Sequence, residues 1–256
     1  MKIAAIQLNP VIGDFTANSS AMLNWAKKAK EEGADLAIFP EMAISGYPPQ
    51  DLLERPAFIA AHQLAMQSLQ EQCGLPILFG SITPCSSPTG KPLHNSAILS
   101  TPAFCHAVHK QLLPTYDVFD ESRYFEPGGA TTPVQFQGKI LGITICEDIF
   151  NDPTLFDLLT EGFDDAEPSK LYAHNPVQNL VDASETGLDI LINIAASPFH
   201  LRKPEVKLAF FRQLAKKHNT PIIYVNQVGG QDSLVFDGQS LVIDGSGNVL
   251  ARAPRF

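Results

Sequence analysis

Short apolar runs rich in β-branched residues alternate along this chain with longer stretches that have helical periodicity. Runs of this length and composition are typical of buried strands, and we expect strands over residues 3–8, 36–39, 77–80, 97–99, 105–108, 140–145, 190–194, 222–225 and 241–243. Four stretches with apolar residues three and four positions apart predict helices over residues 18–32, 57–73, 177–186 and 204–218. The alternation predicts an α/β fold.

The stretch 204–218 shows the helical pattern well. Its apolar residues form one broad face, and Lys207, Arg212 and the other polar residues are expected on the other side. Residues 83–92 and 160–175 are interpreted as loops, and no repeat, low-complexity tract or linker interrupts the pattern. We therefore expect one domain over residues 1–256.

Charge and hydropathy narrow the possible partners. The net charge of −9 repels phosphate backbones, so nucleic acid is not expected as a partner. No apolar run approaches the roughly 20 residues of a membrane span, and residues 1–8 show no signal-peptide pattern. The sequence therefore predicts a cytoplasmic protein without a membrane partner.

Cysteine and histidine spacing gives no metal motif. Cys73, Cys85, Cys105 and Cys146 form no CxxC pair, and the seven histidines match no ligand template. Four reduced thiols and no bound metal are predicted, so each cysteine is free to be either a core residue or a nucleophile.

Three segments partly match nucleotide-binding motifs, but each lacks an essential feature of its motif. Residues 229–233 resemble a pyrophosphate-binding loop, yet Val228 stands where that loop has a serine, and residues 234–238 read as a strand and turn rather than as the required helix. We interpret 229–233 as an ordinary loop. The glycines of residues 80–91 and 245–248 have the wrong spacing or number, and no cofactor is expected within this chain.

Three expected strands end in a reactive side chain: Glu41 follows the second strand, Lys110 the fifth and Cys146 the sixth. Taken singly, Glu41 and Lys110 could be solvated charges, and Cys146 a small core residue. Together they form a complete set for acyl transfer. A thiol needs a base to become a thiolate, a carboxylate can be that base, and an ammonium can stabilise the oxyanion formed on attack.

Longer motifs surround these three residues, and they resemble the nitrilase, or carbon–nitrogen hydrolase, superfamily. Within it, the chain looks most like the glutaminase domains of glutamine-dependent NAD synthetases. The motifs are AxxQLNPxxGD at 4–14, FPEMAISGYPPQDLL at 39–53, HKQLLPTYDVFDESRYFEPG at 109–128 and ICEDIF at 145–150. The resemblance implies an α-β-β-α sandwich of two central sheets with outer helices, and a homo-oligomer.

The resemblance also implies a reaction. Cys146 would attack the side-chain amide of glutamine, Glu41 would relay protons, and Lys110 would stabilise the tetrahedral intermediate. The residues that match the family's glutamine-binding elements are Tyr116, Phe119, Glu147, Ser197 and Lys203. Tyr116 and Phe119 could equally be core aromatics, and the match at Lys203 could instead fall one position earlier, on Arg202.

By the same resemblance, the released ammonia would serve a synthetase domain that converts deamido-NAD to NAD. No segment for that domain follows residue 256, so ATP and magnesium are expected only in a partner domain absent from this chain. Two alternatives remain open: a free-standing amidase or nitrilase that acts on another small amide, and a non-catalytic module that binds a partner.

Overall fold

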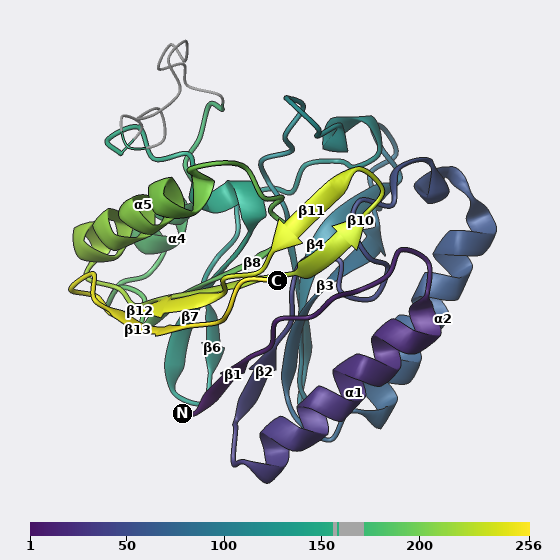
Figure 1. Cartoon of the computed structure of the whole chain (residues 1–256), viewed down its shortest axis with the longest axis horizontal. Coiled ribbons are helices and arrows are strands. Elements are labelled where there is room, and N and C mark those ends of the chain that lie inside the picture. The colour runs from purple at the N-terminus through teal and green to yellow at the C-terminus, as the bar shows by residue number, and fades with distance from the viewer. Residues whose placement is uncertain (156–157, 159–171) are drawn as a thin grey trace.

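Two β-sheets form the centre of the molecule. The computed structural model describes residues 1–155, 158 and 172–256, which form a five-stranded sheet in the order β1-β2-β3-β4-β5, a six-stranded sheet in the order β13-β12-β9-β8-β7-β6, and the hairpin β10-β11 (Figure 1). The strands are β1 (Ile3–Ala5), β2 (Leu36–Ile38), β3 (Ile77–Pro84), β4 (Leu93–Ser100), β5 (Cys105–His109), β6 (Val134–Phe136), β7 (Lys139–Ile145), β8 (Ile190–Ala195), β9 (Ile222–Asn226), β10 (Val228–Gln231), β11 (Leu234–Asp237), β12 (Leu241–Ile243) and β13 (Val249–Arg252).

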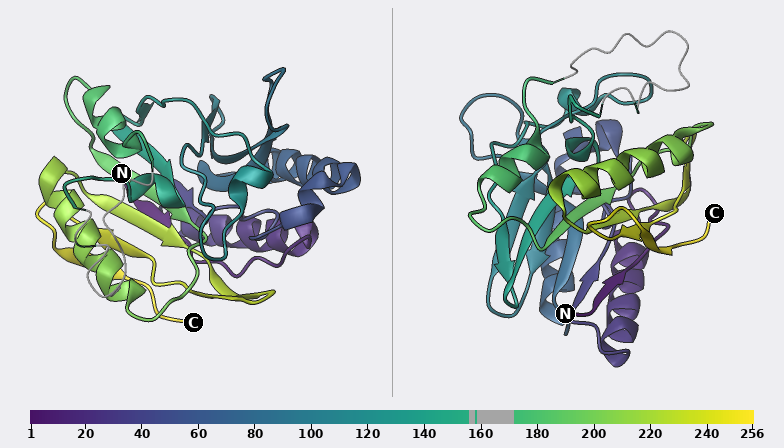
Figure 2. Two further views of the ribbon diagram at one scale, coloured as in Figure 1. Left: turned by 90° about the horizontal axis from the view of Figure 1, so that it is seen from above. Right: turned by 90° about the vertical axis from the view of Figure 1, so that its left-hand side faces the viewer.

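The sheets pack face to face, with helices outside. Leu36 and Ile38 of β2 share one buried cluster with Ile143 and Ile145 of β7, so the main core lies between the sheets. Their neighbour Ala37 belongs to a second cluster, with residues of α1 (Phe15–Glu31) and α2 (Pro56–Gln72), as the alternation of side chains along a strand requires. Helices α4 (Pro176–Asp182) and α5 (Lys203–His218) lie on the six-stranded sheet. Figure 2 shows these layers, which confirm the expected α-β-β-α sandwich.

Strand direction brings several strand ends to the same edge. Strands β1, β2 and β3 are parallel, and two antiparallel steps through β4 make β5 run in the same direction as β3. In the other sheet β7, β8 and β9 are parallel. The carboxyl ends of parallel strands are where α/β sheets usually hold their functional side chains.

Most predicted elements are present, with corrected ends. Strand β1 stops at Ala5: the last hydrogen bond to β2 comes from the N–H of Ile6 to the Ile38 carbonyl at 2.9 Å, and beyond it the carbonyl of Leu8 accepts the N–H of Val228 at 2.8 Å. The first helix begins at Phe15, earlier than predicted, because the Asp14 side chain caps the N–H of Ala17. Helix α4 ends at Asp182, four residues early, with Ala183 as its C-cap, and a turn that contains Gly187 at φ 81° follows.

Residues 229–231 are not a loop but part of β10, which pairs with β11 across a two-residue turn. Of the predicted loop 160–175, residues 160–171 lie outside the described residues. The placement of Lys207 on the polar side of its helix is wrong: it is buried, because it lies four residues before Phe211 on the face packed against the sheet. Among the described residues, none of the helices has the length and apolar character needed to cross a bilayer.

His62 of α2 predicts acid sensitivity of this fold. It lies buried against β3, where its Nε2 accepts the N–H of Ile82 at 3.3 Å, and burial lowers its pKa to about 4. Between pH 6.5 and 4 the unfolded chain therefore binds a proton that the folded chain does not, so stability should fall as pH falls, by up to about 3 kcal/mol. Urea unfolding of His62→Gln across this range should show a shallower decline than the native chain, and above pH 7.5 the two slopes should agree. Equal slopes below pH 6.5 would contradict the prediction.

Candidate active site

Cys146 lies where β7 ends and a short 3₁₀ helix, Cys146–Ile149, begins. Its backbone has φ 46°, a left-handed conformation that costs a non-glycine residue about 1–2 kcal/mol. Asn193 of β8 holds this turn, because its amide donates to the carbonyl of Cys146 at 3.3 Å and to the Thr144 hydroxyl at 3.0 Å. The other three thiols are exposed or half-buried, so Cys146 is the one buried cysteine among the four. A strained turn held from the next strand gives its thiol a fixed position.

Glu41 follows β2 and is completely buried. One carboxylate oxygen accepts the N–H of Ala196 at 2.8 Å, and the other accepts the Asn95 amide at 2.7 Å. Gly80 of β3 makes room for this turn, since a Cβ there would lie 2.4 Å from the Glu41 Cα. Both sheets therefore fix the carboxylate before any substrate binds.

Lys110 follows β5, and its ammonium lies between two buried carboxylates. Its Nζ is 2.9 Å from Glu41 Oε1 and 2.7 Å from Glu121 Oε1. The chain is held beside it by Gly128, whose N–H donates to the Lys110 carbonyl at 2.7 Å and whose missing side chain leaves space for His109. The arrangement fixes the ammonium as a bridge between two acids.

Glu121 is a site residue that the sequence did not single out. It is 5% exposed, and it accepts hydrogen bonds from the Tyr47 hydroxyl at 2.9 Å and from the Asn95 amide at 3.3 Å. Asn95 therefore links both carboxylates. Glu121 lies inside the 109–128 motif, but Asp117, Asp120 and Glu126 lie there too, and no spacing in the sequence distinguishes one acid from the others.

Asp148 connects the cysteine turn to the lysine loop. Its carboxylate accepts the backbone N–H groups of Gln111 at 3.0 Å, Leu112 at 2.8 Å and Ile145 at 3.2 Å. Burial raises the pKa of Asp148 to about 7, against the opposing effect of these hydrogen bonds. A single side chain thus fixes the relative positions of the segments that carry Lys110 and Cys146.

The electrostatics of the centre favour a protonated thiol at rest. Burial raises the pKa of Cys146 well above its usual range, and the Glu41 charge raises it further, against the opposing charge of Lys110. Burial alone would lower the pKa of Lys110, but the charges of Glu121 and Glu41 outweigh it, so the lysine stays an ammonium. The thiol therefore needs a base at the moment of attack, and Glu41 is the anion with the largest effect on it.

Three of the residues expected to bind substrate form a group beside the nucleophile. The Tyr116 hydroxyl donates to both oxygens of Glu147, at 3.0 and 2.9 Å, and the Tyr116 ring meets Phe119 edge to face at 5.5 Å. Burial raises the pKa of Glu147, against the effect of the Tyr116 hydrogen bond. Tyr172, which the sequence did not indicate, also hydrogen-bonds to the side chain of Glu147, and this contact too lowers the pKa of Glu147.

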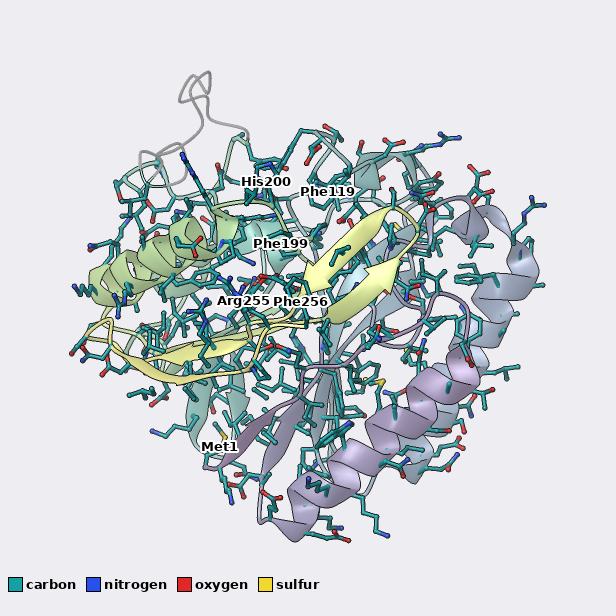
Figure 3. All side chains as sticks on the ribbon, viewed as in Figure 1. Met1, Phe119, Phe199, His200, Arg255 and Phe256 are labelled. Atoms are coloured by element: carbon teal, nitrogen blue, oxygen red, sulfur yellow. The ribbon has the colours of Figure 1, made fainter. Side chains whose placement is uncertain are left out.

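Ser197 and Lys203 complete the set from the segment after β8. Asn226 fixes the backbone of Ser197 by accepting its N–H at 2.8 Å and donating to its carbonyl at 3.3 Å. Lys203 begins α5, and its ammonium lies 5.9 Å from the centre of the Phe119 ring. Between them, Phe199 lies beside β11 (Figure 3), and its N–H donates to the Val235 carbonyl at 2.7 Å. The structure therefore brings all eight predicted site residues to one region.

A cavity of about 200 Å³ lies next to this centre. Tyr47 and Glu121 line it, together with Leu53, Val118 and Tyr124, but Cys146 does not. The cavity therefore reaches the buried Glu121 but not the Cys146 thiol. Within the described part of the chain, no group of three His, Cys, Asp or Glu residues is arranged to hold a metal ion.

Several known proteins are similar to this chain in sequence. A family model for carbon–nitrogen hydrolases matches residues 2–164 and 171–256. The glutamine-dependent NAD(+) synthetase of Synechocystis is 38% identical over 260 residues, which cover 99% of this chain and 44% of that protein. The corresponding protein of Acinetobacter baylyi is 34% identical and is covered to 42%. The chain thus spans less than half the length of these relatives.

Solved structures agree in fold. The glutamine-dependent NAD+ synthetase of Acinetobacter baumannii, in complex with ADP, superposes with a TM-score of 0.81 at 33% identity, over 99% of this chain and 43% of that one. An amidase of the nitrilase superfamily from Nesterenkonia has a TM-score of 0.76 at 19% identity and is covered to 86%. At that identity the amidase supports the shared fold alone.

Proposed function

Because this chain belongs to the carbon–nitrogen hydrolase family, we propose that it hydrolyses the side-chain amide of glutamine to glutamate and ammonia through a thioester on Cys146. The observation that carries the proposal is the buried Glu41–Lys110 pair, 2.9 Å apart, whose charges act on the Cys146 thiol. The names of the longer relatives, which are glutamine-dependent enzymes, favour glutamine as the substrate.

The reaction follows from the roles open to these three residues. Glu41 accepts the thiol proton as the sulfur attacks the amide carbon, and the negative charge that forms on the carbonyl oxygen is stabilised by the Lys110 ammonium. Glu41 then returns the proton to the departing nitrogen, which leaves as ammonia. Water, deprotonated by Glu41, attacks the thioester and releases glutamate, restoring the thiol.

The residues expected to bind the substrate have the chemistry needed to hold an amino acid. A substrate ammonium needs an anion, which Glu147 offers next to the nucleophile, and a substrate carboxylate needs a cation, which Lys203 offers from the start of α5. Tyr116 and Phe119 would contact the aliphatic part, and Ser197 would add a hydrogen bond. Glu121 would keep Lys110 charged and in place.

The relatives' greater length and their name suggest where the ammonia goes. We propose that a synthetase partner uses it to make NAD from deamido-NAD, with ATP and magnesium bound by that partner and no cofactor needed by residues 1–256. The same proposal includes a single hydrolase domain, homo-oligomeric assembly and a cytoplasmic location.

Trapping the acyl-enzyme tests the function directly. Incubation with glutamine, followed by acid quenching and mass spectrometry, should show a glutamyl adduct on the peptide that contains Cys146. Cys146→Ala should lose the adduct and lower turnover by at least about 10⁴-fold. The control Cys105→Ala, which removes an exposed thiol of β5, should keep both.

Other outcomes would identify the alternatives. An adduct on Cys73, Cys85 or Cys105 would refute the assignment of the nucleophile. Faster turnover of asparagine or of a simple aliphatic amide than of glutamine would favour a free-standing amidase. Absence of any adduct, together with failure of a glutamine-like diazo-ketone to alkylate Cys146, would favour a non-catalytic module.

A further inference from the structure

Lys207 is a buried ammonium without a carboxylate partner. It is 6% exposed, and no Asp or Glu oxygen lies within ion-pair distance of it among the described residues. Its Nζ donates to the Tyr224 hydroxyl at 3.2 Å and lies 5.1 Å from the centre of that ring. Burial of an unpaired charge costs several kcal/mol, so an apolar residue would suit this packing better. The position needs an explanation beyond packing.

The charges around Lys207 do not neutralise it. Burial lowers its pKa to about 8, the charges of Lys203 and Arg252 lower it as well, and the charge of Asp237 acts in the opposite direction. Asp237, at the end of β11, is the one carboxylate in this set, and one of its oxygens accepts a hydrogen bond from Gln239 instead. Around neutral pH the amine therefore remains protonated.

Tyr224 connects this lysine to the candidate active site. It lies on β9 under α5, and a hydrogen bond with the side chain of Ser197 is among the contacts that act on the pKa of its hydroxyl. Burial raises the pKa of Tyr224 well above its usual range, so the hydroxyl keeps its proton. An ammonium can only donate, so the tyrosine oxygen accepts from Lys207, and its own proton is available for the Ser197 oxygen.

This order of donors determines where the hydroxyl of Ser197 can direct its proton. Asn226 already holds the backbone of Ser197 by two hydrogen bonds, and the neighbouring Ala196 N–H is held by Glu41. Only the hydroxyl of Ser197 is left to rotate. If its oxygen accepts from Tyr224, its proton points elsewhere and needs an acceptor, and a carboxylate is a strong one.

We propose that Lys207 is a positioning residue that, through Tyr224, orients the Ser197 hydroxyl as a hydrogen-bond donor to the carboxylate of the substrate. The inference rests on the proposed function, because it requires an amide substrate that also carries a carboxylate. Two lysines one helical turn apart on α5 thus have different roles: Lys203 faces the substrate, and Lys207 acts on it indirectly, through Tyr224.

Two variants test this chain of contacts. Lys207→Met keeps the length and removes the charge, and Tyr224→Phe keeps the ring and removes the hydroxyl. Each should raise the KM for glutamine about tenfold and change kcat less than threefold. The double variant should be no worse than the more affected single one, since both changes break the same chain. Lys216→Met, at an exposed position of α5, is the matched control and should have no effect.

The rate of Cys146 alkylation by iodoacetamide shows whether the site itself is intact. This small neutral reagent needs no carboxylate recognition, so both variants should react at the native rate, and Lys207→Met should melt at or above the native temperature. An unchanged KM, additive effects, or parallel losses of kcat and alkylation would refute the positioning role while leaving the proposed function in place. A native chain that does not hydrolyse glutamine would refute both.

Discussion

Glu41→Gln is expected to lower kcat for glutamine hydrolysis by about a thousandfold. General acid–base catalysis contributes roughly 10²–10⁴ to enzymatic rates, and Glu41 would act in both the acylation and the deacylation steps. The amide cannot accept a proton from the thiol. It also cannot accept hydrogen bonds on both sides, where the carboxylate receives the Ala196 N–H on one oxygen and Lys110 and Asn95 on the other.

Steady-state kinetics measures this effect, and alkylation separates it from structural damage. Because the Glu41 charge raises the pKa of Cys146, its removal should leave the iodoacetamide reaction no slower than in the native chain. Glu71→Gln, on the exposed surface of α2, is the control and should keep full turnover. A kcat within tenfold of native for Glu41→Gln would exclude Glu41 as the base.

The sequence could locate Glu41, Lys110 and Cys146 because each of them follows an apolar run. Strand ends at one edge of a rigid sheet are brought together by topology, so residues far apart in the chain become neighbours once the strand order is known. The structure adds the distances: the Lys110 and Glu41 side chains, 69 residues apart, meet at 2.9 Å.

Glu121 and Lys207 escaped the sequence analysis for different reasons. Glu121 begins a single 3₁₀ turn, Glu121–Arg123, in a segment without hydrophobic periodicity. Four acidic residues look alike there, and only the fold selects the one that meets Lys110. Lys207 follows helical periodicity, but its charge suggested the solvent side of α5. Position on the helix outweighed polarity there, because Tyr224 supplies a hydroxyl under the helix that no local pattern reveals.

Asp148 and Asn226 illustrate a third limit of sequence analysis. Each is a buried polar residue that holds backbone groups from another segment: Asp148 holds the loop after Lys110, and Asn226 holds Ser197. Such contacts satisfy polar groups that irregular backbone leaves unpaired. They depend on which segments pack together, and this is known only from the three-dimensional fold.

Lys110→Met is expected to destabilise the fold by about 3–5 kcal/mol as well as to abolish turnover. The substitution leaves Glu41 and Glu121 buried and close to each other without the ammonium that now lies between them at 2.9 and 2.7 Å. Removing one partner of a buried ion pair has a cost of this size, because the remaining charge is uncompensated. Urea unfolding at pH 7 measures it.

Two companion variants make this last expectation specific. Glu121→Gln added to Lys110→Met should recover part of the lost stability, because it removes one of the two unpaired charges. Lys139→Met breaks the half-exposed pair with Asp189, 2.8 Å apart, and should cost less than about 1 kcal/mol. The deficit of Lys110→Met should also shrink from pH 7 to pH 5 as its buried carboxylates take up protons, relative to the native chain at each pH. A deficit as small as that of Lys139→Met would show that the buried charges are not held as the structure places them.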